Sequence, residues 1–232
     1  MHYFFLHINH INKHNTPIHH GMPIVNTILP DFSPQVAIAL WRIEESEEQL
    51  LALCREANIP TLSLLSGLSH SKRRIECMAE HLLIHSLIGA DYRLLHNDNG
   101  MPLLDGSNLC ISISHTKHYV VVALSKHTIG IDIEMCQPKI LRVRSHFLSE
   151  AEQSAISPDS LPLNTAAWTA KEALYKAIGV SGIDFANDVT IDAPQLVASP
   201  EAYTCRFANR HFLLHTIYEA EFAFTLAVEN KE

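Results

Sequence analysis

Two short stretches of the chain carry acidic side chains in patterns that suit metal and phosphate chemistry. The first is residues 130–134 (GIDIE), where isoleucines alternate with acids after a β-branched run, and this pattern favours a strand. Residues two apart on a strand point to the same face, so Asp132 and Glu134 project together while Ile131 and Ile133 face the core. The strand therefore predicts a pair of neighbouring carboxylates.

The second stretch is residues 168–176 (WTAKEALYK), whose strong helix formers without Gly or Pro predict a helix. Glu172 and Lys176 stand one turn apart on one side of that helix. Three carboxylates and a lysine from the two stretches suit Mg²⁺, a hard cation bound by few carboxylates plus substrate phosphates. Each stretch alone has an ordinary alternative, a protected strand edge in the first and a solvated charged face in the second.

A third stretch, residues 111–117 (ISISHTK), is a strand that runs into hydroxyl, imidazole and ammonium groups. Ser114, His115 and Lys117 are suitable donors for phosphate oxygens, although a lone histidine at such a place is more often structural.

Lys72, Arg73 and Arg74 open a helix, where cations are unfavourable for the helix dipole. The local cost makes sense if these residues grip an external anion that also uses the helix end, and the alternative is a solvated cationic turn.

The composition limits the classes of function. With 232 residues, 47% of them hydrophobic, the chain is ordinary globular material. No apolar run approaches the roughly 20 residues needed to cross a bilayer. A formal net charge of −8 gives no general reason to expect nucleic-acid binding. Five widely spaced cysteines without a C-x-x-C pair argue against a disulfide framework or structural zinc, and no secretory signal precedes them, so we expect a cytoplasmic protein.

Hydrophobic periodicity and turn residues predict an α+β chain. The His-rich residues 1–21 are expected to be a tail, with a metal-binding tract as the alternative and Met22 as a plausible start. We expect one α+β half over residues 22–126 and another over 127–232. We expect Ser71 to cap a helix that ends at Gly89, and three consecutive strands to form one antiparallel sheet. The helices are predicted over 46–58, 71–88, from 149 and 163–179, and the strands over 36–41, 109–114, 119–125, 128–133, 203–207, 212–218 and 222–228.

In four ordered pieces the sequence resembles the Sfp-type 4′-phosphopantetheinyl transferase superfamily. The combination of GIDIE with W-x-x-K-E-A-x-x-K at this separation is much more specific than either motif alone. The pieces are KRRIECMAEHLL (72–83), NGMP with SISHTKHYVVVA (99–123), GIDIE (130–134), and FLSEAE with WTAKEALYKAIG (147–179).

The resemblance implies that coenzyme A is the donor and that its phosphopantetheine arm moves to a serine hydroxyl of an apo acyl- or peptidyl-carrier protein. Adenosine 3′,5′-bisphosphate would be released. It also implies two similar α+β halves, a pseudo-duplicated fold with the active site at their interface, and we expect a monomer. Implied roles are Mg²⁺ ligation by Asp132, Glu134 and Glu172, pyrophosphate binding by Lys176, phosphate contacts from Ser114 and His115, nucleotide contacts from Arg73 and Arg74, and a further acid near the site at Glu152.

Because a protonated serine is a poor nucleophile, we hypothesise that Glu172, or a metal-bound water that it orients, takes the hydroxyl proton. The chain departs from the family at Met101, where Lys is common, so one phosphate contact is either missing or supplied by Lys117. It also departs at Glu80-His81, where Gly-Arg is common. These departures leave open a degenerate module that binds coenzyme A or carrier without transfer. A further alternative is a metal-dependent phosphohydrolase that uses the same carboxylates on water. Three basic residues that follow the metal strand are candidates for carrier recognition: Lys139, Arg142 and Arg144.

Overall fold

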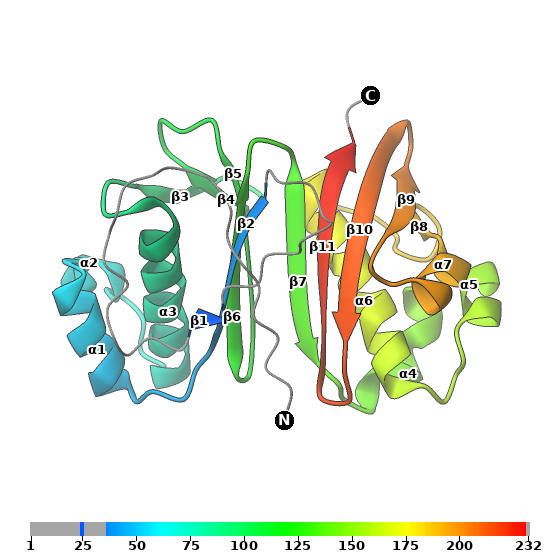
Figure 1. Ribbon diagram of the computed structural model, residues 1–232, viewed down its shortest axis with the longest axis horizontal. Coiled ribbons are helices and arrows are strands. Elements are labelled where there is room, and N and C mark those ends of the chain that lie inside the picture. The colour runs from blue at the N-terminus through cyan, green and yellow to red at the C-terminus, as the bar shows by residue number, and fades with distance from the viewer. Residues whose placement is uncertain (1–23, 26–35, 231–232) are drawn as a thin grey trace.

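The computed structural model describes residues 24–25 and 36–230 of the chain. The predicted tail, residues 1–21, and the expected start of the first half at Met22 lie outside these residues. Two β-sheets occupy the middle of the molecule, and helices cover the outer side of each (Figure 1). This mixture of separate helices and mainly antiparallel strands confirms the predicted α+β class. No helix in the described part of the chain has the length and apolar character needed to span a membrane.

The first sheet has the strand order β1-β2-β6-β5, and three helices and a small hairpin belong to the same region of the sequence. The elements are β1 (Ile24–Val25), β2 (Val36–Arg42), β5 (Cys110–Thr116), β6 (Tyr119–Ser125), α1 (Glu47–Glu56), α2 (Thr61–Leu64), α3 (Ser71–Ile88), and the hairpin of β3 (Leu94–His96) and β4 (Pro102–Leu104).

The second sheet has the strand order β7-β11-β10-β9-β8, with further helices on its outer side. The elements are β7 (Ile129–Met135), β8 (Thr190–Ile191), β9 (Tyr203–Phe207), β10 (Arg210–Tyr218), β11 (Phe222–Asn230), α4 (Lys139–Val143), the 3₁₀ turn η1 (Arg144–His146), α5 (Glu150–Ala155), α6 (Leu161–Ile178) and α7 (Ala193–Ala198).

The helix ends follow the local sequence, with one exception. Ser149 caps α5 in a reciprocal capping box with Glu152, as expected. Gly179 ends α6 with a left-handed backbone, a conformation that costs glycine little. The prediction that Ser71 caps α3 is wrong, because Ser71 is the first helical residue and its hydroxyl donates to Glu47 of α1 (2.6 Å). That side chain links two helices instead of satisfying the helix end.

The prediction that three consecutive strands share one antiparallel sheet is also wrong. β5 and β6 pair as expected, but β7 pairs with β11 in the second sheet, with Asp132 opposite Thr225. The reason is that the partner of β7 lies almost a hundred residues away, and local alternation carries no information about such a pairing. The strand with the expected metal ligands therefore opens the second sheet.

Three buried apolar clusters hold these layers together. One lies between the first sheet and α1 and α3 and contains Trp41 and Met78. Another lies between the second sheet and α6 and contains Leu174 and Phe212. The third joins both sheets, and its buried residues come from β2, β6, β7 and β11, with Val121 of β6 and Ile131 of β7 among them. Burial of apolar surface between the sheets therefore fixes β5 and β6 beside β7.

Candidate active site

The carboxylates of β7 and α6 are brought together because the helix lies directly against the strand. Ile131 and Ile133 are fully buried, which confirms the alternation predicted for β7, and Asp132 is 6% exposed. A Cβ atom at Gly130 would lie 1.9 Å from the carbonyl oxygen of Ala173, so only glycine permits this approach. The close contact places Glu172 and Lys176, which flank Ala173, beside the acids of the strand.

Asp132 has two chemically different carboxylate oxygens. Its Oδ1 accepts hydrogen bonds from the Ser114 hydroxyl (2.8 Å) and the Lys176 ammonium (2.9 Å). Its Oδ2 is buried and has no hydrogen-bond partner. An unpaired carboxylate oxygen of this kind is costly in a protein interior unless a cation binds it.

Like charge accumulates around Asp132. Burial raises the pKa of Glu172 to about 7, and repulsion from Asp132 and from Glu134 adds to the effect. Burial also raises the pKa of Glu134, again with a contribution from Asp132. A divalent cation would stabilise the ionised forms of Glu134 and Glu172, which burial and the nearby charge of Asp132 disfavour.

The donor chemistry therefore fits Mg²⁺, which prefers carboxylate oxygens. Among residues 36–230, however, no three Asp, Glu, His or Cys side chains are arranged as a ready metal-binding group. Binding of one ion by Asp132, Glu134 and Glu172 accordingly stays a prediction.

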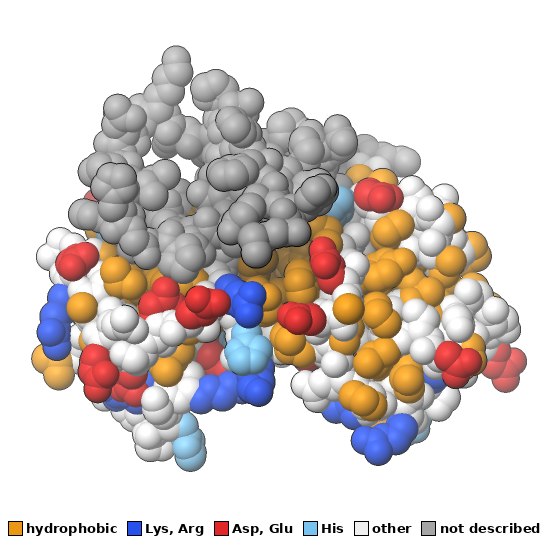
Figure 2. Space-filling model, turned by 60° about the horizontal axis from the view of Figure 1, so that its bottom comes forward, with side chains coloured by type: hydrophobic (Ala, Val, Ile, Leu, Met, Phe, Trp, Pro, Cys, Tyr) orange, Lys and Arg blue, Asp and Glu red, His pale blue; other side chains and the backbone are white. Residues whose placement is uncertain are grey.

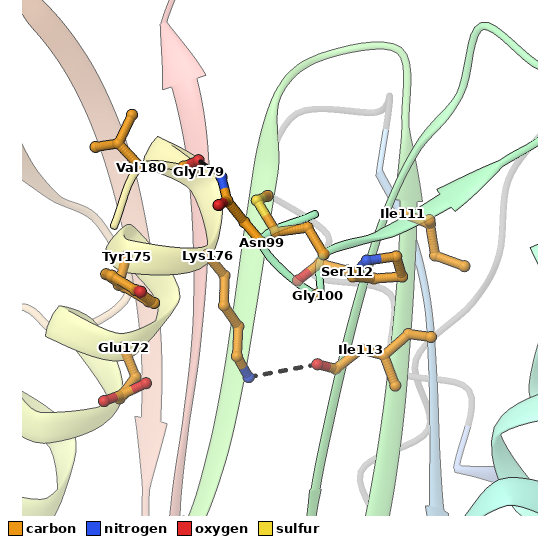
Figure 3. A pocket seen from close by; sticks show the side chains of 12 residues that line it. Asn99, Gly100, Ile111, Ser112, Ile113, Glu172, Tyr175, Lys176, Gly179 and Val180 are labelled. Carbon is orange, nitrogen blue, oxygen red and sulfur yellow. Dashed lines mark hydrogen bonds between the residues drawn. The ribbon is translucent and has the colours of Figure 1, made fainter. Parts of the chain in front are cut away.

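Side chains of β5 and α6 bridge the seam between the two sheets. The Ser112 and Ser114 hydroxyls accept hydrogen bonds from the backbone amides of Ile131 (3.0 Å) and Ile133 (3.3 Å). The Lys176 ammonium donates to the carbonyl oxygens of Ile113 (3.3 Å) and Ile131 (2.9 Å). Figure 3 shows the lysine reaching from α6 toward Ile113 of β5. Because β5 and β7 belong to different sheets and are not paired with each other, these side-chain contacts link the two strands.

A cavity of about 230 Å³ opens next to this seam and is lined by three elements. Residues 99–102 of the β3–β4 turn and 111–113 of β5 form one side. The opposite side comes from α6 and the residues that follow it, with Glu172, Tyr175 and Lys176 pointing toward the space (Figure 3). The space-filling view shows the molecule hollowed between its two lobes, with Lys, Arg and His side chains on the lobe at the left of the hollow (Figure 2). A ligand in the cavity would contact Glu172 directly.

The predicted basic contacts form a separate cluster at the start of α3. Arg73 Nη1 lies 3.2 Å from His115 Nε2 and 3.1 Å from Glu80 Oε1. Glu76, which is 5% exposed, also faces this cluster, with its Oε1 3.5 Å from His115 Nδ1. The side chains of Arg73 and His115 are thus adjacent, but two buried acids already neutralise them. Their roles as phosphate or nucleotide contacts remain untested.

Arg74 and Lys117 lie apart from that cluster. The guanidinium of Arg74 forms an ion pair with Glu47 of α1. Lys117 is exposed at the turn between β5 and β6. The internal partner of Arg74 shows that a cation at a helix start can be explained without an external anion.

Glu152, expected as a further acid near the site, forms a fully buried ion pair with Lys171. The ammonium donates to both carboxylate oxygens (2.8 and 2.9 Å), and Glu152 also accepts from the Ile191 amide (2.9 Å). Burial lowers the pKa of Lys171, and the charge of Glu152 opposes that effect. The geometry indicates that this pair anchors α5 and α6 to the second sheet.

Sequence reasoning missed two features of the site. It did not find Glu76, the buried acid beside His115, and no local signal distinguishes that residue from an exposed helix acid. It also assigned Ser114 to phosphate binding, whereas the hydroxyl contacts Asp132. The alternation in ISISH could have shown that Ser112 and Ser114 share one face of β5.

Comparisons with known proteins address the stretch that carries the carboxylates. Residues 128–227 match the model of the 4′-phosphopantetheinyl transferase superfamily. This span contains Asp132, Glu134, Glu172 and Lys176, and it confirms the resemblance predicted from the sequence. The basic cluster at Arg73 and His115 lies outside it.

A curated protein with the same family name is also similar to this chain. The 4′-phosphopantetheinyl transferase gsp of Aneurinibacillus migulanus is 34% identical over 87 residues. The matched stretch spans 36% of this chain and 36% of that transferase. The likeness to that transferase therefore rests on about a third of each protein.

Proposed function

We propose that this protein transfers the 4′-phosphopantetheine group of coenzyme A to a serine hydroxyl of an acyl- or peptidyl-carrier protein and releases adenosine 3′,5′-bisphosphate. One observation carries the proposal. The superfamily match, residues 128–227, contains Asp132, the Lys176 ammonium that donates to it, and the acids Glu134 and Glu172 whose pKa values its charge helps to raise. The name of the similar Aneurinibacillus protein supports the same activity.

Asp132, Glu134 and Glu172 are the residues that would hold Mg²⁺. When bound, the ion would shield the negative charge of the pyrophosphate under attack. The unpaired Oδ2 of Asp132 and the mutual repulsion of the carboxylates support this assignment.

The protein's own side chains would orient the reactants. The cavity beside Glu172 and Lys176 would accommodate part of coenzyme A, with Tyr175 on one wall and Ser112 on the other. Glu172 lines this cavity and is therefore placed to take the proton of the attacking serine hydroxyl. The Lys176 charge lies where it would attract the pyrophosphate.

The site would lie between two similar halves, residues 22–126 and 127–232. Each proposed half has a sheet with one helix of 18 residues packed on it, α3 in the first and α6 in the second. The cavity draws its walls from both halves. No disulfide joins any of the five cysteines, all of which lie in the described residues 36–230, and this suits a cytoplasmic location. We propose a monomer because both walls of the cavity come from one chain.

Intact mass of a panel of apo acyl- and peptidyl-carrier proteins, incubated with this protein, coenzyme A and Mg²⁺, tests the proposal. At least one carrier should gain the mass of one phosphopantetheine, and replacing its acceptor serine with alanine should prevent the gain. Chelation of Mg²⁺ should also prevent it. Release of adenosine bisphosphate without any carrier would support the phosphohydrolase, and coenzyme A binding without transfer to any carrier would support the binding module. Either result would contradict the proposal.

A further inference from the structure

The two carboxylate oxygens of Asp132 have different hydrogen-bond partners. Both donors that reach the carboxylate, Ser114 and Lys176, contact the same oxygen, Oδ1. The other oxygen, Oδ2, is buried and has no hydrogen-bond partner, and Asp132 as a whole is 6% exposed. The surroundings thus fix the orientation of the carboxylate.

Ser114 has no hydrogen-bonding capacity left for a phosphate donor role. A serine hydroxyl has a single proton to donate, and that of Ser114 goes to Asp132 Oδ1. The Ser114 hydroxyl oxygen accepts a hydrogen bond from the Ile133 amide (3.3 Å), and Ser114 is 5% exposed. Ser114 is therefore committed to the seam between β5 and β7.

Lys176 is similarly saturated. An ammonium group donates three hydrogen bonds, and the three acceptors of Lys176 are the carbonyls of Ile113 and Ile131 and Oδ1 of Asp132. Its charge stays close to the cavity, but its protons already have partners within the protein.

We propose that Ser114 and Lys176 are positioning residues that together hold Oδ1 of Asp132, so that Oδ2 is the oxygen presented to the divalent cation. The inference rests on the metal site of the proposed function. It assigns to the first sheet a part in cation binding, because Ser114 belongs to β5 while the carboxylates belong to β7 and α6. Docking of the two sheets and assembly of the cation site are then one event.

The affinity for Mn²⁺, which favours oxygen ligands as Mg²⁺ does, tests this inference without any need for turnover. Free Mn²⁺ is followed by its electron paramagnetic resonance signal during titration of the intact protein. Ser114→Ala removes the hydroxyl without changing any charge, so it is a cleaner probe than a change at Lys176. Loss of a partner that orients a metal ligand costs about 10–100-fold in affinity, and we expect a decrease of that size.

Ser112→Ala is the matched control, because Ser112 is equally buried on the same strand and bonds the Ile131 amide but not Asp132. It removes one contact between β5 and β7, and its Mn²⁺ affinity should stay within about threefold of the unmodified protein, since no metal ligand loses a partner. Ser114→Thr keeps the hydroxyl and should restore most of the affinity. Thermal unfolding of each variant verifies that it is folded.

Unchanged affinity in folded Ser114→Ala, or an equal decrease in Ser112→Ala, would overturn the inference while leaving the proposed transferase activity intact. Absence of Mn²⁺ binding by the unmodified protein, with and without coenzyme A, would overturn both this inference and the metal site. The transferase activity is measured in a separate experiment, from the mass of the carrier, so its failure is distinguished from failure of this inference.

Discussion

At the scale of single residues, the site depends on acids held in a partly buried, mutually repulsive cluster. Burial raises the pKa of Glu172 to about 7, and the charges of Asp132 and Glu134 add to the effect. Burying ionised carboxylates close together lowers the free energy of unfolding, and without a bound cation favourable packing elsewhere in the protein must offset this cost. Function and stability therefore make opposite demands on this residue.

Glu172→Gln is expected to abolish most turnover without loss of the fold. The amide keeps the size of the side chain but neither accepts a proton nor binds a cation as an anion, and a general base contributes about 10²–10⁴-fold to rate. Because the change relieves repulsion with Asp132 and Glu134, the free energy of unfolding should stay the same or rise. Carrier modification rates and urea unfolding measure the two effects.

Glu150→Gln, an exposed acid at the start of α5, is the matched control. Near-normal transfer by Glu172→Gln would remove Glu172 from the proposed chemistry. Equal losses in the two variants would point to a general effect of the substitution.

The stability of the first sheet and its helices should fall in mild acid through His81. Burial lowers the pKa of His81 to about 4, with a smaller contribution from His96, and its Nδ1 lies 2.7 Å from the Tyr92 hydroxyl. The unfolded chain has the ordinary value near 6.5, so below that pH it binds a proton that the folded protein excludes. The contribution is complete above about pH 6.5 and is lost as the pH falls toward 4, at up to about 1.4 kcal/mol per pH unit.

Urea unfolding at pH 7 and pH 5 measures this effect. His81→Gln, which can keep a hydrogen bond to Tyr92, should lose less stability than the unmodified protein over this range. His118→Gln, at an exposed histidine, controls for the loss of an imidazole. An identical pH dependence in the His81 variant would show that the buried imidazole is not its source.

At the scale of elements, contact between α6 and β7 determines whether the carboxylates meet. The helix presents Ala173 and Ala177 to the strand, and Gly130 lies under both. Small side chains on both elements allow the backbones to approach. The geometry of Asp132 relative to Glu172 and Lys176 follows from this packing.

Gly130→Ala is expected to push α6 away from β7. Its Cβ would lie 1.9 Å from a backbone carbonyl that cannot rotate aside, and overpacking of this kind costs about 1–3 kcal/mol or more. The change should lower both the unfolding free energy and the affinity for Mn²⁺. Gly106→Ala is the control, because its backbone is left-handed but a new Cβ would contact nothing within 4 Å. Equal effects of the two substitutions would contradict this account of the packing.

The sequence predicts one carrier-binding patch of three basic residues at α4 and the turn after it, but these residues differ in exposure and in their partners. Lys139 and Arg142 are exposed, and Lys139 lies close enough to lower the pKa of Glu134 against the larger effect of burial. Arg144 instead donates to Asn164 (3.0 Å) and to the Ile156 carbonyl (2.8 Å). Only the first two are available to a partner.

Arg142→Glu should therefore raise the carrier KM several-fold with little effect on stability, because it reverses an exposed charge. Arg144→Glu should lower the unfolding midpoint, because it removes internal hydrogen bonds. Steady-state kinetics against carrier concentration and thermal unfolding distinguish the two. An unchanged KM in Arg142→Glu would exclude this part of α4 from carrier recognition.

At the scale of the whole molecule, the seam between the sheets explains what sequence reasoning could and could not find. The strand β7, the helix α6 and the grouping of their acids follow from local alternation and helix propensity, and both elements form as expected. The partners of Ser114 and Lys176 do not, because the contact of β5 with β7 arises from tertiary packing between distant parts of the chain. The same limit explains why β7 was expected in the wrong sheet.

The net charge of −8 gives the whole molecule no long-range attraction for an acidic partner, so the proposed recognition of a carrier would have to be local. The internal neutralisation of Arg73 and Arg74 strengthens this conclusion, since fewer basic groups are free than the sequence suggests. Figure 2 shows Lys, Arg and His side chains on the surface that borders the hollow between the two lobes.

The stoichiometry of a single reaction tests the central claim most directly. A limiting amount of one responsive apo carrier is incubated with this protein, coenzyme A and Mg²⁺, and both products are quantified over time. The account predicts one adenosine 3′,5′-bisphosphate for each phosphopantetheine attached to the carrier serine, and neither product when Mg²⁺ is chelated. Bisphosphate release that continues after the carrier is consumed, or equal transfer in the absence of any divalent ion, would contradict it.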